Sequence, residues 1–168
     1  SIYKVSKLVY SSYHTYCAIL VSEIIKYFDS ENNGEQWTIG LISPYKAQAI
    51  LMNKLITSYG ISENVKVYSD TVHGFQGDEC DIVIFLINPN NTYHSGHKKS
   101  LLSKEYIYNV AISRAKNNLW ILNPFNDITN NPYVNQLKKI LNISQNEIIS
   151  SYDIENILFG QKDFIESN

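Results

Sequence analysis

The chain has 168 residues, of which 44% are hydrophobic and 18% are charged, proportions that suit one globular domain with a substantial core. Its formal net charge of −2 excludes a surface coated in basic residues, although a local basic patch could still bind nucleic acid. Cys17 and Cys80 form no metal-binding spacing, so we expect no disulfide framework and a reducing, cytoplasmic compartment. No apolar run approaches the length that a membrane-spanning helix needs, so no membrane partner is expected.

Hydrophobic periodicity divides the first half of the chain into alternating helices and strands. Ser43 supplies a hydroxyl N-cap and Pro44 suits a first helical position, so a helix is expected to begin there, and Gly60 can end it. In chain order, the predicted elements are a helix over about 13–28, a strand over 36–43, a helix over 43–58, a strand over 65–68 and a polar loop over 71–81.

The run Ile82–Ile87 is wholly apolar, which is typical of a strand covered on both faces in a parallel sheet. After it, the predicted elements are a long loop over 88–99, a helix over 103–116, a buried strand over 119–122, a helix opened by Asn131-Pro132 with Val134, Leu137 and Leu141 inward, and a last helix that Ser144 and Glu147 cap and that ends at Leu158. This alternation predicts an α/β fold with a mainly parallel sheet.

Arg114 is the only arginine in the chain. A guanidinium grips phosphate oxygens two at a time, which lysine cannot do, so Arg114 is a candidate anion ligand. The alternative is an ordinary surface arginine. In parallel sheets the functional residues lie at the carboxyl ends of strands. Three stretches are expected there: Ser43-Pro44-Tyr45, residues 71–79, and the helix that carries Arg114.

The loop over 71–79 combines two glycines with side chains that suit a ligand. Gln76 offers a donor and an acceptor, Glu79 could accept from a sugar hydroxyl, and Thr71 could bond a phosphate. Such a loop alone is more often a simple turn, and the helix start at Ser43 is likewise more often free of ligand than an anion site. His94 and His97 beside Cys80 lack further ligands at fixed spacing, so no metal site is expected. There is no Walker A loop and no acidic pair after a strand to hold Mg²⁺.

In combination and order, these stretches resemble the second RecA-like domain of superfamily 1 helicases, in the subgroup that contains the nonsense-mediated-decay helicase and its bacterial relatives. Residues 39–48 resemble motif IV, 71–84 resemble motif V, and 109–116 resemble motif VI. The resemblance implies a RecA-like, P-loop NTPase-type α/β fold that lacks its own Walker A loop. It also implies one domain over 1–168, with a core over about 13–143 and an extension over 144–168, excised from a longer helicase.

The resemblance implies a role for each matching residue. Arg114 would be the arginine finger that reaches the γ-phosphate of ATP, while Glu79 would contact the ribose, Gly77 would lie near the phosphates and Gln76 would couple nucleotide state to strand grip. The family often has a second arginine where Tyr16 stands here. The nucleic-acid contacts would come from Ser43, Pro44, Tyr45, Thr71 and His73.

The function expected from this resemblance is that of the C-terminal motor domain of an ATP-dependent DNA or RNA helicase. ATP and Mg²⁺ would be bound mainly by an N-terminal RecA-like domain, so this domain alone should be inactive. Its partners would be that domain and single-stranded nucleic acid. One alternative is a non-catalytic binding module that keeps the helicase half-fold, and another is an unrelated α/β domain for a small ligand.

Overall fold

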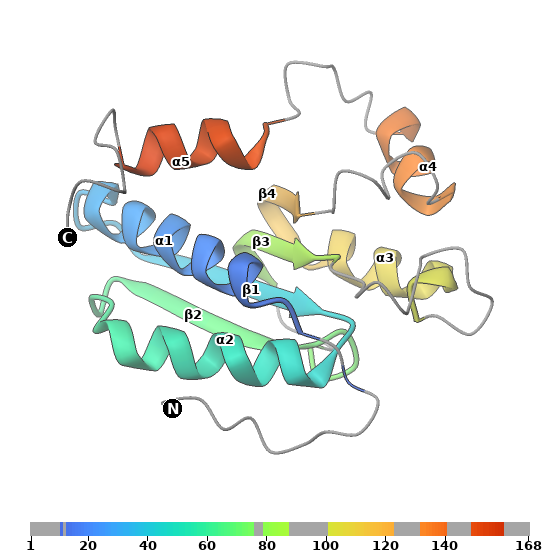
Figure 1. Ribbon diagram of the computed structural model, residues 1–168, viewed down its shortest axis with the longest axis horizontal. Helices are drawn as coiled ribbons and strands as arrows, with labels where there is room; N and C mark the ends of the chain where they lie inside the picture. Colours follow the sequence, from blue (N-terminus) through green and yellow to red (C-terminus); the bar gives the residue numbers. More distant parts are fainter. Residues whose placement is uncertain are drawn as a thin grey trace.

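The computed structural model describes residues 11, 13–75, 79–87, 101–122, 132–140 and 149–159. Helices and strands alternate through most of this part of the chain, as Figure 1 shows. The elements are α1 (Thr15–Glu31), β1 (Trp37–Ser43), α2 (Lys46–Tyr59), β2 (Val65–Thr71), β3 (Cys80–Leu86), a 3₁₀ turn (Leu101–Ser103), α3 (Glu105–Ser113), β4 (Ala115–Leu122), α4 (Pro132–Ile140) and α5 (Ser151–Phe159).

The four strands form one sheet in the order β2-β1-β3-β4, and every neighbouring pair is parallel. The apolar run of β3 lies between β1 and β4, and Ile82–Ile87 are all buried, as the sequence predicts. The predicted RecA-like α/β fold with a parallel sheet is therefore confirmed.

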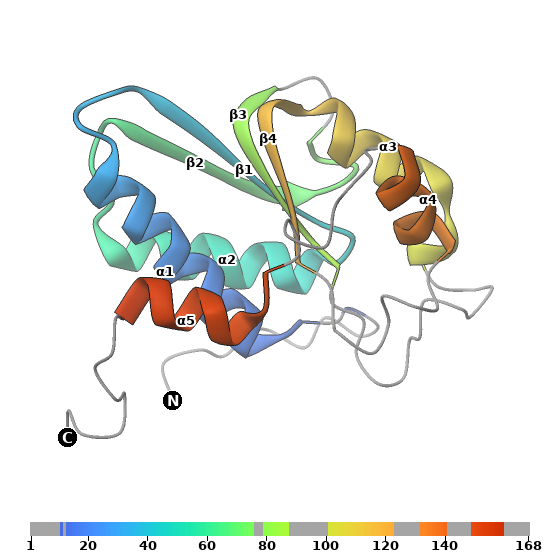
Figure 2. The ribbon, with the colours of Figure 1, turned by 90° about the horizontal axis from the view of Figure 1, so that it is seen from above.

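Successive side chains of the inner strands point to opposite faces of the sheet and build two cores. Ile39 and Leu41 of β1 join α1 and α2 on one face, whereas Ile42 joins α3 and α4 on the other. Figure 2 shows the sheet between these two groups of helices, with α5 beside α1. Each fully buried isoleucine or leucine stabilises the fold by about 1.5–3 kcal/mol relative to an exposed one.

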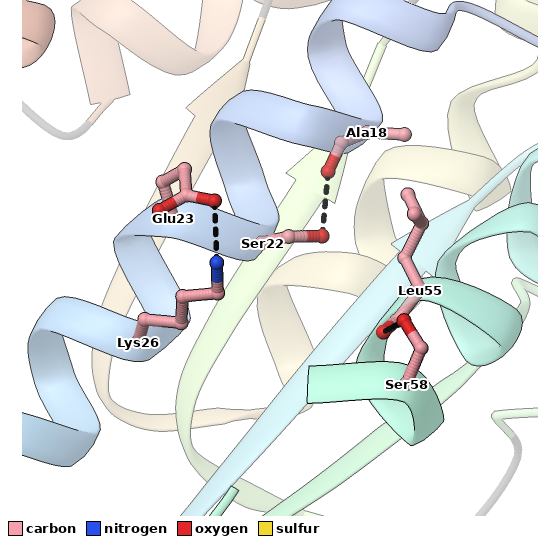
Figure 3. A network of polar contacts seen from close by, with 6 residues as sticks. All are labelled: Ala18, Ser22, Glu23, Lys26, Leu55 and Ser58. Carbon is pink, nitrogen blue, oxygen red and sulfur yellow. Dashed lines mark hydrogen bonds and ion pairs between the residues drawn. The ribbon is translucent and has the colours of Figure 1, made fainter. Parts of the chain in front are cut away.

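Figure 3 shows one serine hydroxyl in α1 and one in α2 that donate to carbonyl oxygens of their own helices. The buried hydroxyl of Ser22 donates to the carbonyl oxygen of Ala18 at 2.8 Å. Ser58 likewise donates to the carbonyl of Leu55 at 2.6 Å. The buried Ser22 hydroxyl therefore keeps a hydrogen-bond partner.

The start of α2 differs from the prediction. The helix begins at Lys46, because Ser43 is still the last residue of β1, paired with Thr71 of β2. The Ser43 hydroxyl accepts the N–H of Tyr45 at 3.1 Å, so it closes a tight turn before the helix and does not cap it. The other end is as predicted, since Gly60 ends α2 with φ of +62°, a conformation that favours glycine.

Two later boundaries also differ from the prediction. The helix α3 ends at Ser113, and Arg114 lies in the turn before β4, not on the helix. The strand β4 is only half-buried along 119–122, because it is an edge strand of the described sheet. The last helix begins at Ser151 and is capped by a reciprocal pair, Ser150 and Asp153. Ser144 and Glu147, the predicted cap, lie outside the described residues.

The connection from β2 to β3 contains no helix in its described residues, 72–75 and 79. Because both strands are parallel, the residues between Thr71 and Cys80 must run from the carboxyl end of β2 back to the amino end of β3, past β1. Phe75 packs on β1 at Gly40, where a Cβ atom would lie 2.8 Å from the ring carbon Cζ of Phe75. Glycine at position 40 thus provides the space for this crossover.

None of the helices in the described part of the chain is long and apolar enough to cross a membrane.

Candidate functional site

Glu79 and Arg114 lie next to each other at the amino ends of two neighbouring strands. The backbone N–H of Cys80 donates to the carbonyl oxygen of Arg114 at 2.9 Å, and Cys80 pairs with Ala115 in the register of β3 and β4. The prediction that Arg114 and Glu79 lie at the carboxyl edge is therefore wrong. Each residue precedes its strand, and in a parallel sheet that places both at the opposite edge.

The Arg114 side chain keeps donors that nothing in the described part of the chain uses. It is partly buried, and its Nε is buried without a hydrogen-bond acceptor among those residues. No carboxylate among the described residues forms an ion pair with Arg114. Glu79, which precedes the neighbouring strand, is exposed. Orphaned buried donors are costly and rare, so this guanidinium suits an anion that arrives from outside the chain. Gln76 and Gly77 lie outside the described residues.

Thr71 and His73 lie at the carboxyl edge of the sheet, in a tight turn that starts the crossover. The Thr71 hydroxyl accepts the N–H of Gly74 at 3.2 Å, and its carbonyl accepts the N–H of Phe75 at 3.0 Å. A Cβ at position 74 would lie 2.2 Å from Oδ2 of Asp70, so a side chain there would displace this exposed carboxylate. His73 is exposed and Thr71 is partly exposed.

Ser43, Pro44 and Tyr45 reach the same edge but are buried. The start of α2 is already engaged by the chain itself, because the N–H of Ala47 donates to the Ser11 hydroxyl at 2.8 Å. The backbone of His14 also donates to Gln48 Oε1 at 2.7 Å. These contacts fasten the chain before α1 to α2, so the helix start is less open to an anion than its sequence suggests.

Tyr16, at the position where relatives of the resembled family often have a second arginine, joins two helices. Its hydroxyl donates to the carboxylate of Glu155 in α5. The Tyr16 side chain is 46% exposed. In this structure the residue therefore holds α5 against α1.

The structure also brings Tyr106 to the carboxyl edge, which sequence reasoning missed. The Tyr106 ring, in the first turn of α3, lies 5.7 Å from the His73 ring, centroid to centroid, at 40°. Its hydroxyl lies 3.5 Å from His73 Nε2, and Lys104 Nζ lies 5.8 Å from its centroid. The only indication of this pair in the sequence was a tyrosine at a helix position that lies off the apolar face.

Asp81 and Thr38 join the amino ends of β3 and β1. The Asp81 carboxylate accepts the Thr38 hydroxyl at 2.6 Å and the Thr38 N–H at 2.9 Å, and the Asp81 N–H donates back to the Thr38 hydroxyl at 2.9 Å. The hydrogen bonds from the hydroxyl and backbone of Thr38 lower the pKa of Asp81, burial opposes them, and the charge of Lys116 adds to the lowering.

A cavity of about 490 Å³ opens beside Asp81 on the side of α1. Its lining offers carboxylates, amides and aromatic rings but no lysine, arginine or histidine, so it is poorly suited to a phosphate. Neither Glu79 nor Arg114 lines it. The lining residues are Phe28, Glu35, Gln36, Trp37, Asp81, Ile82, Asn117, Asn118 and Trp120.

The described residues contain no group of three or more His, Cys, Asp or Glu side chains that could hold a metal ion. Cys17 and Cys80 are both buried and are not joined in a disulfide, and burial raises the pKa of the Cys17 thiol to about 12. His94 and His97 lie outside the described residues.

Residues 6–124 match a protein family described as an AAA domain. Among curated proteins, the chain is 35% identical over 104 residues to the DNA polymerase alpha-associated DNA helicase A of Saccharomyces cerevisiae, covering 61% of this chain and 14% of that protein. It is 27% identical over 143 residues to the DNA replication ATP-dependent helicase/nuclease dna2 of Schizosaccharomyces pombe. That match covers 81% of this chain and 10% of that protein. Helicase SEN1 of Saccharomyces cerevisiae is 35% identical to it over 86 residues, a match that covers 50% of this chain and 4% of that protein. The chain therefore spans only a small part of each of these relatives.

Proposed function

Because this chain belongs to the AAA domain family and is a helicase-type domain, we propose that it is the C-terminal motor domain of an ATP-dependent superfamily 1 helicase. The observation that carries the proposal is Arg114, a partly buried guanidinium whose Nε has no acceptor among the described residues. Within the superfamily, we place the chain in the subgroup of the nonsense-mediated-decay helicase. The domain has its core over residues 13–143 and an extension over 144–168.

At the amino edge, Arg114 binds the terminal phosphate of ATP and Glu79 accepts a hydrogen bond from the ribose. Bound ATP and Mg²⁺ supply the phosphoryl group and its charge neutralisation, and they are held mainly by an N-terminal RecA-like domain. Gly77 allows the backbone to approach the phosphates, and Gln76 relays the nucleotide state. An arginine finger of this kind accelerates phosphoryl transfer by about 10³- to 10⁵-fold.

At the carboxyl edge, Thr71 and His73 contact the backbone of a single strand of DNA or RNA. Both are accessible, and contacts from hydroxyls to phosphates fix a protein on nucleic acid without reading its sequence. The buried stretch Ser43-Pro44-Tyr45 helps to position Thr71, because Ser43 of β1 pairs with Thr71 of β2. The crossover through Phe75 joins the two edges by one covalent segment.

A second candidate function is a non-catalytic binding module that keeps the helicase half-fold. It is favoured by Tyr16, which contacts Glu155 where a second arginine would serve the phosphate. The two candidates differ in whether Arg114 matters for turnover.

The test is nucleic-acid-stimulated ATP hydrolysis by the full-length protein that contains this chain. We expect Arg114→Ala to reduce turnover by about 10³-fold or more, and Arg114→Lys to recover little of it, because lysine lacks the planar fork. Lys66→Ala, an exposed cation on β2, is the matched control and should leave turnover unchanged. Unaltered turnover in Arg114→Ala would refute the finger and favour the binding module.

A further inference from the structure

Tyr106 and His73 form an exposed aromatic pair beside Thr71. Their ring centroids are 5.7 Å apart with an angle of 40° between the planes, and the Tyr106 hydroxyl lies 3.5 Å from His73 Nε2. One ring comes from the turn after β2 and the other from the first turn of α3. The pair therefore forms only when the crossover and α3 are both in place.

Exposure alone does not single out Tyr106. Its side chain is 40% exposed, while Tyr68 and Tyr152 are 51% and 70% exposed. Tyr106 differs from Tyr68 and Tyr152 in that it has a second ring beside it and a lysine, Lys104, 5.8 Å from its centroid. A ring that is already held in place loses little conformational entropy when a flat ligand stacks on it.

The charges around the pair favour a contact through a base over a contact through a phosphate. Lys104 is close, but the carboxylates of Glu105, in the same helical turn, and Asp70, which accepts the N–H of Thr71 at 2.6 Å, are the acidic groups nearest in the chain. The formal charges of Lys104, Glu105 and Asp70 sum to −1, so these three side chains together give phosphates no net attraction. Bases, in contrast, carry no charge and stack on aromatic rings regardless of their identity.

We propose that Tyr106, backed by His73, is a stacking platform for one base of the bound single strand. This inference rests on the proposed function, since it adds a base contact to the backbone contacts of Thr71. Thr71 fixes the phosphates of the strand, and Tyr106 receives the base of a nucleotide next to them. Because stacking is indifferent to base identity, the platform suits a protein that moves along any sequence.

The test measures affinity of the full-length protein for a fluorescently labelled thymidine oligonucleotide of roughly 12 nucleotides. By fluorescence anisotropy, Tyr106→Ala should weaken binding by about 5- to 150-fold, the range for loss of one stacked base. Tyr106→Phe should keep the affinity of the unmodified protein, because stacking needs the ring and not the hydroxyl. Tyr68→Ala, which removes a more exposed tyrosine on β2, should change nothing.

A second oligonucleotide of equal length, with every base replaced by an abasic linker, keeps the phosphates and removes the bases. On this probe the unmodified protein should bind more weakly, and the difference between it and Tyr106→Ala should vanish. Equal affinity of Tyr106→Ala and unmodified protein for the thymidine strand would overturn the platform alone. So would a loss in Tyr106→Phe as large as in Tyr106→Ala, since it would assign the effect to the hydroxyl. No binding of either oligonucleotide by the unmodified protein would overturn strand binding itself, and the platform with it.

Discussion

The backbone N–H of Cys80 donates to the carbonyl oxygen of Arg114 at 2.9 Å. This single hydrogen bond joins the first residue of β3 to the residue just before β4, so it fixes the separation of Glu79 and Arg114. Under the proposed function, this spacing would preset the distance between the ribose contact and the phosphate contact, which lowers the entropic cost of nucleotide binding.

The Thr71 hydroxyl should contribute to strand affinity without contributing to its salt dependence. We expect Thr71→Val to weaken single-strand binding by about 2- to 13-fold, the value of one neutral hydrogen bond. The slope of affinity against salt concentration should stay unchanged, because threonine neutralises no phosphate. Titrations by anisotropy at several salt concentrations check both points.

Thr71→Ser keeps the hydroxyl that accepts the Gly74 N–H and would contact the phosphate, so it should bind like the unmodified chain. Thr57→Val, on the exposed side of α2, is the control and should bind normally. A strand affinity of Thr71→Val equal to that of the unmodified chain would contradict the assignment.

Gly40 should tolerate no side chain while Phe75 crosses it. In Gly40→Ala the new Cβ would lie 2.8 Å from Phe75 Cζ, and we expect a loss of about 1–3 kcal/mol in unfolding free energy from this overpacking. Phe75→Leu in the same chain should relieve part of the clash. A double-mutant cycle from urea denaturation checks this, and strictly additive losses would show that the two positions do not touch.

Asp81 should make the fold more sensitive to acid. Because the hydrogen bonds from Thr38 lower its pKa in the folded state, its contribution is fully present above the unfolded pKa of about 3.9 and disappears as the pH falls through the lower, folded value. Asp81→Asn should cost about 1 kcal/mol at neutral pH, at the low end for charged hydrogen bonds because the carboxylate is partly exposed.

The measurement is the urea midpoint of the unmodified and Asp81→Asn chains from pH 7 to pH 3. The gap between the two midpoints should narrow with falling pH. A constant gap over this range would mean that the Asp81 charge makes no difference to stability. Glu63→Gln, an exposed carboxylate outside this network, serves as the control.

The Cys17 thiol should resist alkylation in the folded chain. With its pKa raised to about 12, the thiolate fraction at pH 8 is on the order of 10⁻⁴, and the side chain is also 8% exposed. Intact mass measured over time with iodoacetamide should show almost no addition at Cys17 until urea unfolds the chain. Fast modification mapped to Cys17 under native conditions would contradict its burial.

Much of the fold was predictable because strands that are covered on both faces, and helix ends, leave clear patterns in the sequence. The apolar run Ile82–Ile87 indicated a strand covered on both sides, and β3 occupies that place. The end of α2 at Gly60 was also predictable, since a positive φ favours glycine. These features depend on local conformational preference and hydrophobicity, which can be inferred from neighbouring residues in the sequence.

The candidate site was less predictable because it depends on which edge of the sheet a residue reaches. Arg114 precedes β4, and a shift of the helix end by a few residues decides whether it lies on α3 or in the turn. Ser43 could cap a helix or end a strand, and its pairing with Thr71 decided the outcome. The pair of His73 and Tyr106 joins positions 33 residues apart, so no local pattern announces it.

Arg114 also offers a spectroscopic handle. A chain with one arginine, grown with isotope-labelled arginine, contains a single labelled Nε–H group. That proton is buried and has no acceptor within the described residues, so its chemical shift and its exchange with water should respond directly when a phosphate arrives. Phosphate or nucleotide binding to this chain could then be followed through one resonance that needs no assignment.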